Sequence, residues 1–476
     1  MNQNKYKGLA LFILALSQLI LALDYTIIYV AIPSLAADLG FSANNLQWVV
    51  SAYALTYGGF LLIGGRMSDL LGRRRMFIVA MSIFGLGSLL GGLANTQLLL
   101  ILARGLQGLG GALLSPATLS LIVSNFEEGN ERNRAMGIWA SMGGIGLSLG
   151  LLLGGVLTSY IGWESTFYVN IPIALLTIVL APVALAESRT PSKTRHYDLA
   201  GAFSVTAGMI FIVYYLIQSP TEGWLHAGTI VPGLIGAALL LLFVVIENRT
   251  KEPLLPFRLF NIRNLNGATL SAVLFSASFG TLYYFLTLYT QEVLQFSAVQ
   301  SGLSFLPLTI SALVGAKLVN RMVTSVGVAG TIASGMGLGV IGFLLLTLLS
   351  DAGSAWGIIP GTVIVGIGQA LVFTTMYIAG TTGIEMKEQG VASAIVTTGQ
   401  QIGGSVGLAV IMAIITAGIG TNATMETLEP TVLNQAIQTA LFLDAVIALL
   451  GAAVAFITLK QKKSKMVDAF STKQTG

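Results

Sequence analysis

The 476-residue sequence contains no cysteine, only two histidines, and charged residues at only 9% of its positions. Without cysteine, a disulfide, a thiolate metal site and a thiol redox centre are all excluded. With so few histidines, no zinc or iron site is expected either, and we expect no cofactor of any kind. Soluble proteins carry roughly a quarter charged residues. The low charge, next to a hydrophobic share of 54%, therefore indicates a protein whose apolar surface faces lipid.

Two further absences narrow the function. The chain has no Gly-x-x-x-x-Gly-Lys-Ser/Thr loop, which excludes an ATP-driven pump. It also has no His-Glu-x-x-His motif and no histidine within an apolar run, so a membrane-embedded metalloenzyme is disfavoured. The basic residues lie beside apolar runs, where they report membrane topology, so nucleic acid is not expected as a partner.

Apolar runs dominate what is present. A helix that crosses a bilayer needs about 20 mostly apolar residues. The sequence contains fourteen such runs: 8–32, 46–65, 76–94, 97–124, 134–159, 165–186, 199–218, 228–247, 265–291, 301–322, 327–349, 355–380, 390–419 and 435–459. The pattern predicts an all-α membrane protein of fourteen spans. The first run could be read as a signal peptide, but its length and Asp24 favour a retained span.

The distribution of Lys and Arg predicts the orientation. Short cytoplasmic loops carry an excess of these residues. If the N-terminus is cytoplasmic, nearly all 24 of them fall in cytoplasmic loops, at the cytoplasmic ends of spans or in a tail. The clear exception is Arg104, alone within a run, which makes it a functional candidate. We therefore expect a multi-pass protein of the cytoplasmic membrane, with both termini inside.

The loop at 65–75 has a weaker echo at 315–327, which indicates two related halves. Duplicated halves are typical of secondary transporters. We expect an N-terminal six-helix bundle at 1–186, two additional helices with flanking cytoplasmic loops at 187–263, a C-terminal six-helix bundle at 264–460 and a cytoplasmic tail at 461–476.

Four segments, at residues 23–33, 65–75, 100–112 and 137–155, carry a resemblance that covers nearly the whole chain. They are similar to the major facilitator superfamily, and more narrowly to its drug:proton antiporters with fourteen spans. The resemblance implies the major facilitator fold and transport by alternating access. Segment 65–75 resembles the family's inner loop, which latches the two halves. The expected gate residues are Gly65, Asp69, Gly72, Arg73, Arg74 and Glu127, with Arg73 paired to Glu127 or Glu128.

Proton coupling is expected from charged residues inside spans. Arg104 and Gln107 resemble the Arg-x-x-Gln-Gly motif that the family links to proton transfer, and Asp24 is the expected partner of Arg104. Asp444 is a second candidate for protonation. Burial disfavours a charged carboxylate and a nearby guanidinium favours it, so such a pair can exchange a proton. The alternatives are an arginine bound to helix carbonyls and an aspartate bound to neighbouring hydroxyls.

Segment 137–155 resembles the family's antiporter motif. Its expected interface residues are Gly143, Gly146, Gly150, Gly154 and Gly155, since small residues let membrane helices approach closely. Leu151 stands where that motif has proline, the usual cause of a kink. A straight helix and a kinked helix are therefore both open at this point.

Aromatic and amide side chains within the runs are candidates for a central cavity, although each could equally be core packing. They are Tyr25, Tyr29, Tyr53, Gln107, Tyr284, Gln369, Phe373, Tyr377 and Gln400. Rings with few fixed charges suit amphiphilic, lipophilic and cationic molecules. Together with these residues, the resemblance implies a monomeric, non-enzymatic antiporter that uses the proton gradient to export hydrophobic cationic or neutral drugs. The alternative is an exporter of one endogenous lipid, fatty acid, peptide or antibiotic.

Overall fold

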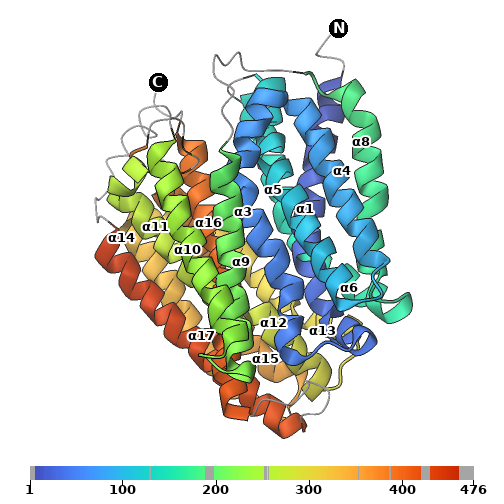
Figure 1. Ribbon diagram of the computed structural model, residues 1–476, viewed down its shortest axis with the longest axis vertical. Coiled ribbons are helices and arrows are strands. Elements are labelled where there is room, and N and C mark those ends of the chain that lie inside the picture. Colours follow the sequence, from blue (N-terminus) through green and yellow to red (C-terminus); the bar gives the residue numbers. More distant parts are fainter. Residues whose placement is uncertain are drawn as a thin grey trace. The chain divides into compact units, whose positions relative to one another are not determined.

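The computed structural model describes residues 6–459 except 128–129, 188–197, 251–252, 254, 256, 352, 385–387 and 420–428. Throughout this part of the chain the regular structure is helical, without strands, as the sequence predicts (Figure 1). The elements are α1 (Lys7–Leu39), α2 (Ala43–Leu46), α3 (Trp48–Leu71), α4 (Arg73–Gly92), α5 (Gln97–Asn125), α6 (Asn130–Tyr160), α7 (Ser165–Tyr168), α8 (Asn170–Ala184), α9 (Leu199–Glu222), α10 (Ala227–Arg249), η2 (Phe257–Asn261), α11 (Arg263–Phe279), α12 (Leu282–Leu288), η3 (Tyr289–Val293), α13 (Ala298–Ser304), α14 (Leu306–Leu346), α15 (Ala355–Thr381), α16 (Gln389–Ile419) and α17 (Pro430–Thr458).

Twelve helical stretches in the described part are long and apolar enough to cross a membrane. A helix suits this setting because it satisfies its own backbone hydrogen bonds where water is absent. One stretch, Ala298–Leu346, has 49 residues and would be about 70 Å long if straight, against a hydrocarbon core of ~30 Å. It changes direction at Gly327, where φ is 77°. The predicted total of fourteen spans stays a prediction.

The chain divides into two compact units. The first unit comprises Met1–Leu255, Leu286–Leu303 and Leu408–Leu433, and the second unit comprises Pro256–Phe285, Ser304–Gly407 and Asn434–Gly476. The domain boundaries expected from the sequence stay predictions.

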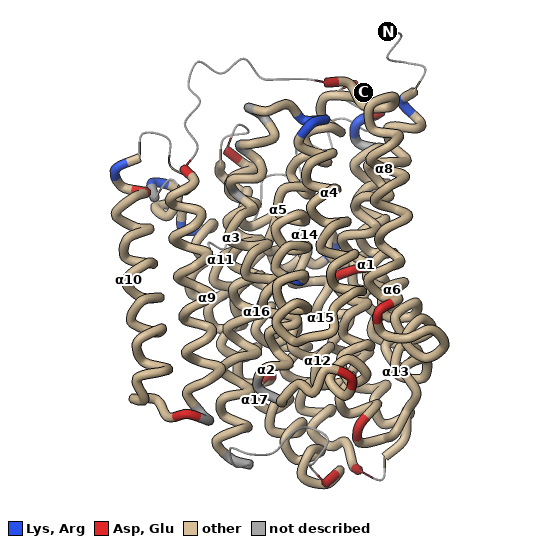
Figure 2. Tube along the Cα trace, turned by 45° about the vertical axis from the view of Figure 1, so that its right-hand side comes forward, with Lys and Arg blue, Asp and Glu red and all other residues tan. Residues whose placement is uncertain are grey.

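In the first unit, α1 packs against α6 and α8, α5 packs against α3 and α4, and α9 joins α3 to α10. Its apolar core lies mainly between α1, α4, α5 and α8 and includes Phe77, Phe84 and Leu114, each with no exposed surface. Lys and Arg in this unit lie mostly at the end of the bundle where α1 begins (Figure 2). This arrangement agrees with the loop charges of the sequence, while the orientation in the membrane stays a prediction.

The seam between α1 and α6 is built from glycines. A Cβ added to Gly146 would lie 2.6 Å from the carbonyl oxygen of Leu19, and one at Gly150 would lie 2.6 Å from that of Leu23. Gly143 and Gly154 also face α1, while Gly155 faces the backbone of Ala298. Small residues at this spacing bring the two backbones together. Helix α6 continues without a break through Leu151. The helix is therefore uninterrupted at the position where the family motif has proline.

A second glycine seam lies between α11 and α16 in the second unit. A Cβ at Gly403 would lie 2.2 Å from the carbonyl oxygen of Val273, and one at Gly407 would lie 2.5 Å from the Cα of Ala277. Both units thus hold their first long helix against a glycine-rich helix, while the relation of the two halves stays a prediction.

Candidate functional site

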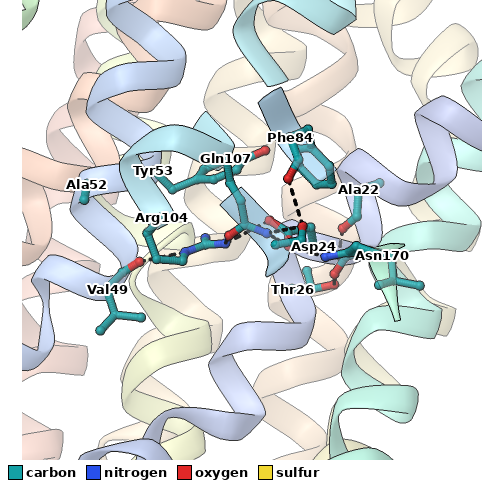
Figure 3. A network of polar contacts seen from close by, with 12 residues as sticks. Ala22, Asp24, Thr26, Val49, Ala52, Tyr53, Phe84, Arg104, Gln107 and Asn170 are labelled. Carbon is teal, nitrogen blue, oxygen red and sulfur yellow. Dashed lines mark hydrogen bonds and ion pairs between the residues drawn. The ribbon is translucent and has the colours of Figure 1, made fainter. Parts of the chain in front are cut away.

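Asp24 lies within α1 and only 1% of its surface is exposed. Its Oδ2 accepts a hydrogen bond of 2.8 Å from Arg104 Nη1. Its Oδ1 accepts two more, each 2.8 Å long, from Gln107 Nε2 and Asn170 Nδ2. The three donors come from α5 and α8 and converge on one carboxylate (Figure 3). A buried charge needs such partners to offset the loss of water.

Arg104 is as buried as its partner, with 2% of its surface exposed. Besides Asp24 it binds the carbonyl oxygen of Val49 on α3 through Nε at 3.0 Å and Gln107 Oε1 through Nη1 at 2.9 Å. Its guanidinium carbon lies 4.5 Å from the centre of the Tyr53 ring, a cation–π contact. The guanidinium is therefore held by a carboxylate, an amide, a carbonyl and an aromatic face.

Gln107 links this pair to α4. Its Nε2 donates to Ser88 Oγ at 2.9 Å as well as to Asp24, so both amide protons are used. A Cβ at Gly87 would lie 2.8 Å from the Gln107 backbone nitrogen, and one at Gly108 would lie 2.3 Å from the Tyr53 carbonyl oxygen. These glycines let α3 and α4 approach α5, which places the polar groups in a closely packed interior.

The chemistry open to this network is reversible protonation of one carboxylate. Arginine stays charged at all ordinary pH values, so a proton here goes to Asp24. Protonation removes the charge that Arg104 neutralises and converts one carboxylate oxygen from an acceptor to a donor. The arrangement can therefore couple a proton to the packing of α1, α5 and α8.

The structure brings together Asp24, Arg104, Gln107 and Tyr53, all of which the sequence singles out. Sequence reasoning missed Asn170 and Ser88. Asn170 begins α8, directly after the interruption that separates α7 from α8. A lone amide in the apolar run 165–186 is the signal that could have found it.

The arginines of the loop at 65–75 bind helix ends. Gly72, with φ of 105°, ends α3 and starts α4, a backbone conformation that favours glycine. Arg73 Nη1 then donates to the Ser120 carbonyl oxygen at 3.3 Å, near the end of α5. Arg74 Nη1 donates at 3.3 Å to the carbonyl oxygens of Pro182 and Leu185 at the end of α8. The C-terminal ends of helices favour such cations, so the two arginines tie this loop to the ends of α5 and α8 by hydrogen bonds.

The remaining gate candidates are placed as follows. A Cβ at Gly65 would lie 3.7 Å from the Pro116 side chain, an ordinary contact. Glu127 lies 3.5 Å from Lys7 Nζ at the start of α1. The side chain of Asp69 and all of Glu128 lie outside the described residues.

Asp444 on α17 is the buried carboxyl of the second unit, with no exposed surface. Its Oδ1 lies 2.8 Å from the Thr281 hydroxyl. Within the described residues, its Oδ2 has no hydrogen-bond partner. The Thr281 hydroxyl also lies 2.6 Å from the Ser278 carbonyl oxygen.

The cavity candidates fall into both units. In the first unit, Tyr25 meets Tyr29 edge-on, and Tyr53 stacks on Tyr57. Within the second unit, the Tyr377 hydroxyl lies 3.0 Å from Thr397 Oγ1 and 3.1 Å from Gln400 Oε1.

The other second-unit candidates differ in exposure. Phe373 meets Tyr377 edge-on and is 42% exposed. Gln369 donates to the Tyr283 hydroxyl at 3.0 Å, and Tyr284 is fully buried. Phe373 is thus an exposed ring beside the Tyr377 phenol, whereas Tyr284 is placed as a core residue.

Comparison with known proteins identifies the family. A sequence model of the Major Facilitator Superfamily matches residues 14–408. The chain is 38% identical to the cephamycin export protein CmcT of Amycolatopsis lactamdurans, over 86% of this chain and 85% of that protein. It is 36% identical to the puromycin resistance protein pur8 of Streptomyces alboniger, over 85% of this chain and 81% of that protein.

The chain is also 32% identical to the multidrug resistance protein Stp of Mycobacterium tuberculosis strain H37Rv, over 89% of this chain and 78% of that protein. Among solved structures, the nucleoside transporter NupG matches with a TM-score of 0.67 and 10% identity, over 95% of this chain and 99% of that one. That likeness shows the fold alone. From its family model and its relatives, the chain belongs to the Major Facilitator Superfamily and is a membrane transporter, not an enzyme.

Proposed function

We propose that this transporter is a proton-coupled antiporter that exports hydrophobic, drug-like compounds, with Asp24 as the carboxyl group that binds the coupling proton. The observation that carries the proposal is the buried contact of 2.8 Å between Asp24 and Arg104. A buried ion pair is costly to assemble and is weak evidence of stabilisation alone. Charged groups inside membrane spans more often mark ion and proton pathways.

In this mechanism one proton binds the Asp24 carboxylate and forms a neutral acid. Arg104 keeps its charge and its contacts with Val49, Gln107 and Tyr53, but it loses the opposite charge that held α1 against α5. Loss of the proton restores the ion pair. Substrate binding would favour one of the two states, so that proton entry and substrate exit alternate.

The substrate class is supported by the relatives and by side chains of the second unit. CmcT, pur8 and Stp are named for cephamycin export, puromycin resistance and multidrug resistance. The exposed Phe373 ring offers a stacking surface, and the neighbouring Tyr377 and Gln400 offer hydrogen bonds without a fixed charge. These groups suit flat amphiphilic compounds, neutral or cationic.

A second function in the same fold is export of a single endogenous compound, such as a lipid, fatty acid, peptide or antibiotic. It is favoured by the narrow names of several relatives, CmcT, pur8 and a lincomycin resistance protein of Streptomyces lincolnensis. Expression in an efflux-deficient bacterium separates the two. Resistance to several unrelated drugs supports the broad exporter, whereas resistance to one compound or none favours the narrow one.

Asp444 is proposed as a second proton-binding group, held neutral in this conformation. The Thr281 hydroxyl has one proton but three acceptors, the Ala277 carbonyl at 3.3 Å, the Ser278 carbonyl at 2.6 Å and Asp444 Oδ1 at 2.8 Å. If Asp444 is protonated at Oδ1, it donates to Thr281 and Thr281 donates to Ser278, so that both hydroxyl protons are used. An ionised Asp444 would compete for that single hydroxyl proton.

Transport into proteoliposomes tests the coupling. Ethidium, a fluorescent lipophilic cation, and puromycin serve as substrates under an imposed pH gradient. We expect Asp24→Asn to abolish accumulation against a concentration gradient while exchange between equal concentrations continues. Full uphill transport by this variant would overturn the assignment.

The matched control is Asp38→Asn, the same substitution on an exposed aspartate of α1 that accepts a hydrogen bond from Trp163. This variant is expected to accumulate substrate like the wild type. An equal loss in both variants would point to damage to α1 instead of loss of a proton site.

A further inference from the structure

Only one of the two polar atoms of the Asn170 side-chain amide makes a hydrogen bond within the described residues. Its Nδ2 donates to Asp24 Oδ1 at 2.8 Å, and none of its surface is exposed. Within the described residues, its Oδ1 has no hydrogen-bond partner. Buried polar atoms are normally satisfied, and an exception in a native structure calls for an explanation. The unpartnered oxygen belongs to a residue that already touches the central carboxylate.

The other amide of the network has no such spare atom. Gln107 uses Nε2 for Asp24 and Ser88, and its Oε1 accepts from Arg104 at 2.9 Å. Turning this amide over would give up the contact with Arg104. Among the groups bound to Asp24, only Asn170 therefore combines a donor in use with a free acceptor.

The unpartnered Asn170 oxygen is an acceptor for a hydrogen bond that Asp24 can donate only when it is protonated. While Asp24 is ionised it accepts hydrogen bonds, so the amide turns its NH₂ toward the carboxylate. A protonated Asp24 carries an O–H group that must be donated. Arg104 has donors only, and Gln107 could accept that proton only by giving up its hydrogen bond from Arg104. The Asn170 oxygen can, once the amide turns over.

We propose that Asn170 is the positioning residue that stabilises both protonation states of Asp24, by donating its amide N–H to the carboxylate and, after rotation, accepting the O–H of the acid. The step is one proton added to one carboxylate oxygen, with rotation about the last side-chain torsion of Asn170 and no other bond made or broken. That torsion is soft, so α8 need not move. The inference rests on the proposed role of Asp24 as proton-binding group.

The surroundings of Asp24 contain few other groups that could titrate. Arg104 faces it from α5 and Tyr53 from α3, with the Tyr53 ring against the guanidinium. Helix α4 contributes the uncharged Ser88, and α6 presents glycines to α1 at this level. A change of protonation within the network is therefore assigned to Asp24.

Infrared difference spectroscopy of the purified full-length protein during a pH titration tests this without a substrate. The carboxylic-acid C=O band of Asp24 is identified by its absence in Asp24→Asn. In Asn170→Leu the acid loses its acceptor while Arg104 and Gln107 still stabilise the carboxylate. We expect the pH midpoint of that band to move to lower pH by roughly one unit, a tenfold change in proton affinity. Asn170→Ala has the same expected direction if leucine prevents folding.

Asn434→Leu is the matched control. Asn434 is a buried amide of the second unit whose Nδ2 donates to the Leu349 carbonyl oxygen, and within the described residues its Oδ1 also lacks a partner. Its replacement should lower stability without moving the midpoint. Asn170→Gln, which keeps both amide atoms, should move the midpoint back toward the wild-type value.

Three results would overturn the inference. An unchanged midpoint in Asn170→Leu would make Asn170 a packing residue, and a midpoint moved to higher pH would make its N–H the dominant contribution. A wild-type spectrum without any band that Asp24→Asn removes would refute the role of Asp24 itself, and with it the proposed function. The first two results leave that function standing.

Discussion

Two aspartates, Asp24 in the first unit and Asp444 in the second, are equally buried but differently partnered. Asp24 accepts three hydrogen bonds, one of them from Arg104, whereas Asp444 Oδ1 contacts a single threonine hydroxyl. Burial alone therefore does not decide whether a carboxyl group is charged. The partners decide, because an ionised carboxylate without donors is far more costly in an apolar interior than a neutral acid.

The difference supports separate roles for the two sites in the proposed mechanism. Asp24 has donors for its ionised form and, in Asn170, an acceptor for its neutral form, so both states are supported. Asp444 has one hydroxyl partner, and the single proton of that hydroxyl is shared with helix carbonyl oxygens, which favours the neutral form. In the proposed mechanism Asp24 is the group that gains and loses the coupling proton, and Asp444 releases a proton only when its surroundings change.

The largest effect is expected from Arg104→Leu, which leaves Asp24 buried without its cation. Removing one partner of a buried ion pair costs about 3–5 kcal/mol. Unfolding of the purified protein in detergent, followed by denaturant titration at neutral pH, measures the loss. The loss should shrink at acidic pH, because Asp24 can then take up a proton.

The double variant Asp24→Asn with Arg104→Leu provides the control for that experiment. It removes both charges and should be more stable than Arg104→Leu alone. If the two variants unfold alike at every pH, Arg104 does not act through Asp24, and the contrast between the two aspartates loses its basis.

The next largest loss of stability is expected at the glycine seam between α6 and α1, the helix that carries Asp24. In Gly150→Ala the added Cβ would lie 2.1 Å from Thr26 Oγ1 and 2.6 Å from the Leu23 carbonyl oxygen, so α6 must move away from α1. Overpacking of this kind costs about 1–3 kcal/mol. Gly144→Ala, on the same helix with nothing within 4 Å of its Cβ, should cost far less in the same unfolding assay.

The second unit extends this comparison. Gly403→Ala meets the Val273 carbonyl oxygen and should be destabilising to a similar degree. Similar losses at Gly150 and Gly403 would show that the two units share their packing and differ in their carboxyl sites. If Gly403→Ala instead causes no loss of stability, the two units differ in packing as well as in their carboxyl sites.

Much of this arrangement follows from sequence, for a physical reason. Apolar runs predict the helices because a membrane leaves few alternatives for a backbone. Within such runs a charged residue is conspicuous, which is why Asp24 and Arg104 could be singled out and paired before their 2.8 Å contact was seen. Glycines 146, 150 and 154 likewise predict a helix seam from their spacing.

What sequence could not supply are contacts fixed by the packing of distant helices. Asn170 reaches Asp24 across 146 positions, and nothing near Asn170 in the chain indicates that direction. The Thr281 partner of Asp444 and the Val49 carbonyl that binds Arg104 are ordinary residues in apolar segments. Their roles depend on which helix turns face each other, which periodicity does not specify.

A smaller effect is expected from Asp444→Asn. Asparagine has nearly the shape of a neutral aspartic acid and can donate to Thr281, so the free energy of unfolding at neutral pH should change by less than about 1 kcal/mol. Asp24→Asn leaves Arg104 without its counter-charge and should be clearly more destabilising in the same assay. Equal losses would mean that Asp444 is ionised, and the contrast between the two sites would fail.

The smallest effect is expected where opposite charges meet outside the bundle interior. Lys7 Nζ lies 2.9 Å from Glu131 Oε1, and the hydrogen bond from Lys7 holds the pKa of Glu131 below its usual value. Because folding lowers this pKa, the stabilisation is present above the unfolded-state pKa and is lost as the pH falls through the folded-state pKa. Water and salt screen such a pair, unlike the buried pair at Asp24.

Glu131→Gln should therefore lower the melting temperature only slightly at neutral pH, and the difference from the wild type should vanish in acid or at high salt. A loss as large as that of Arg104→Leu would show that exposure does not separate these two ion pairs, and that the start of α1 is held mainly by Glu131.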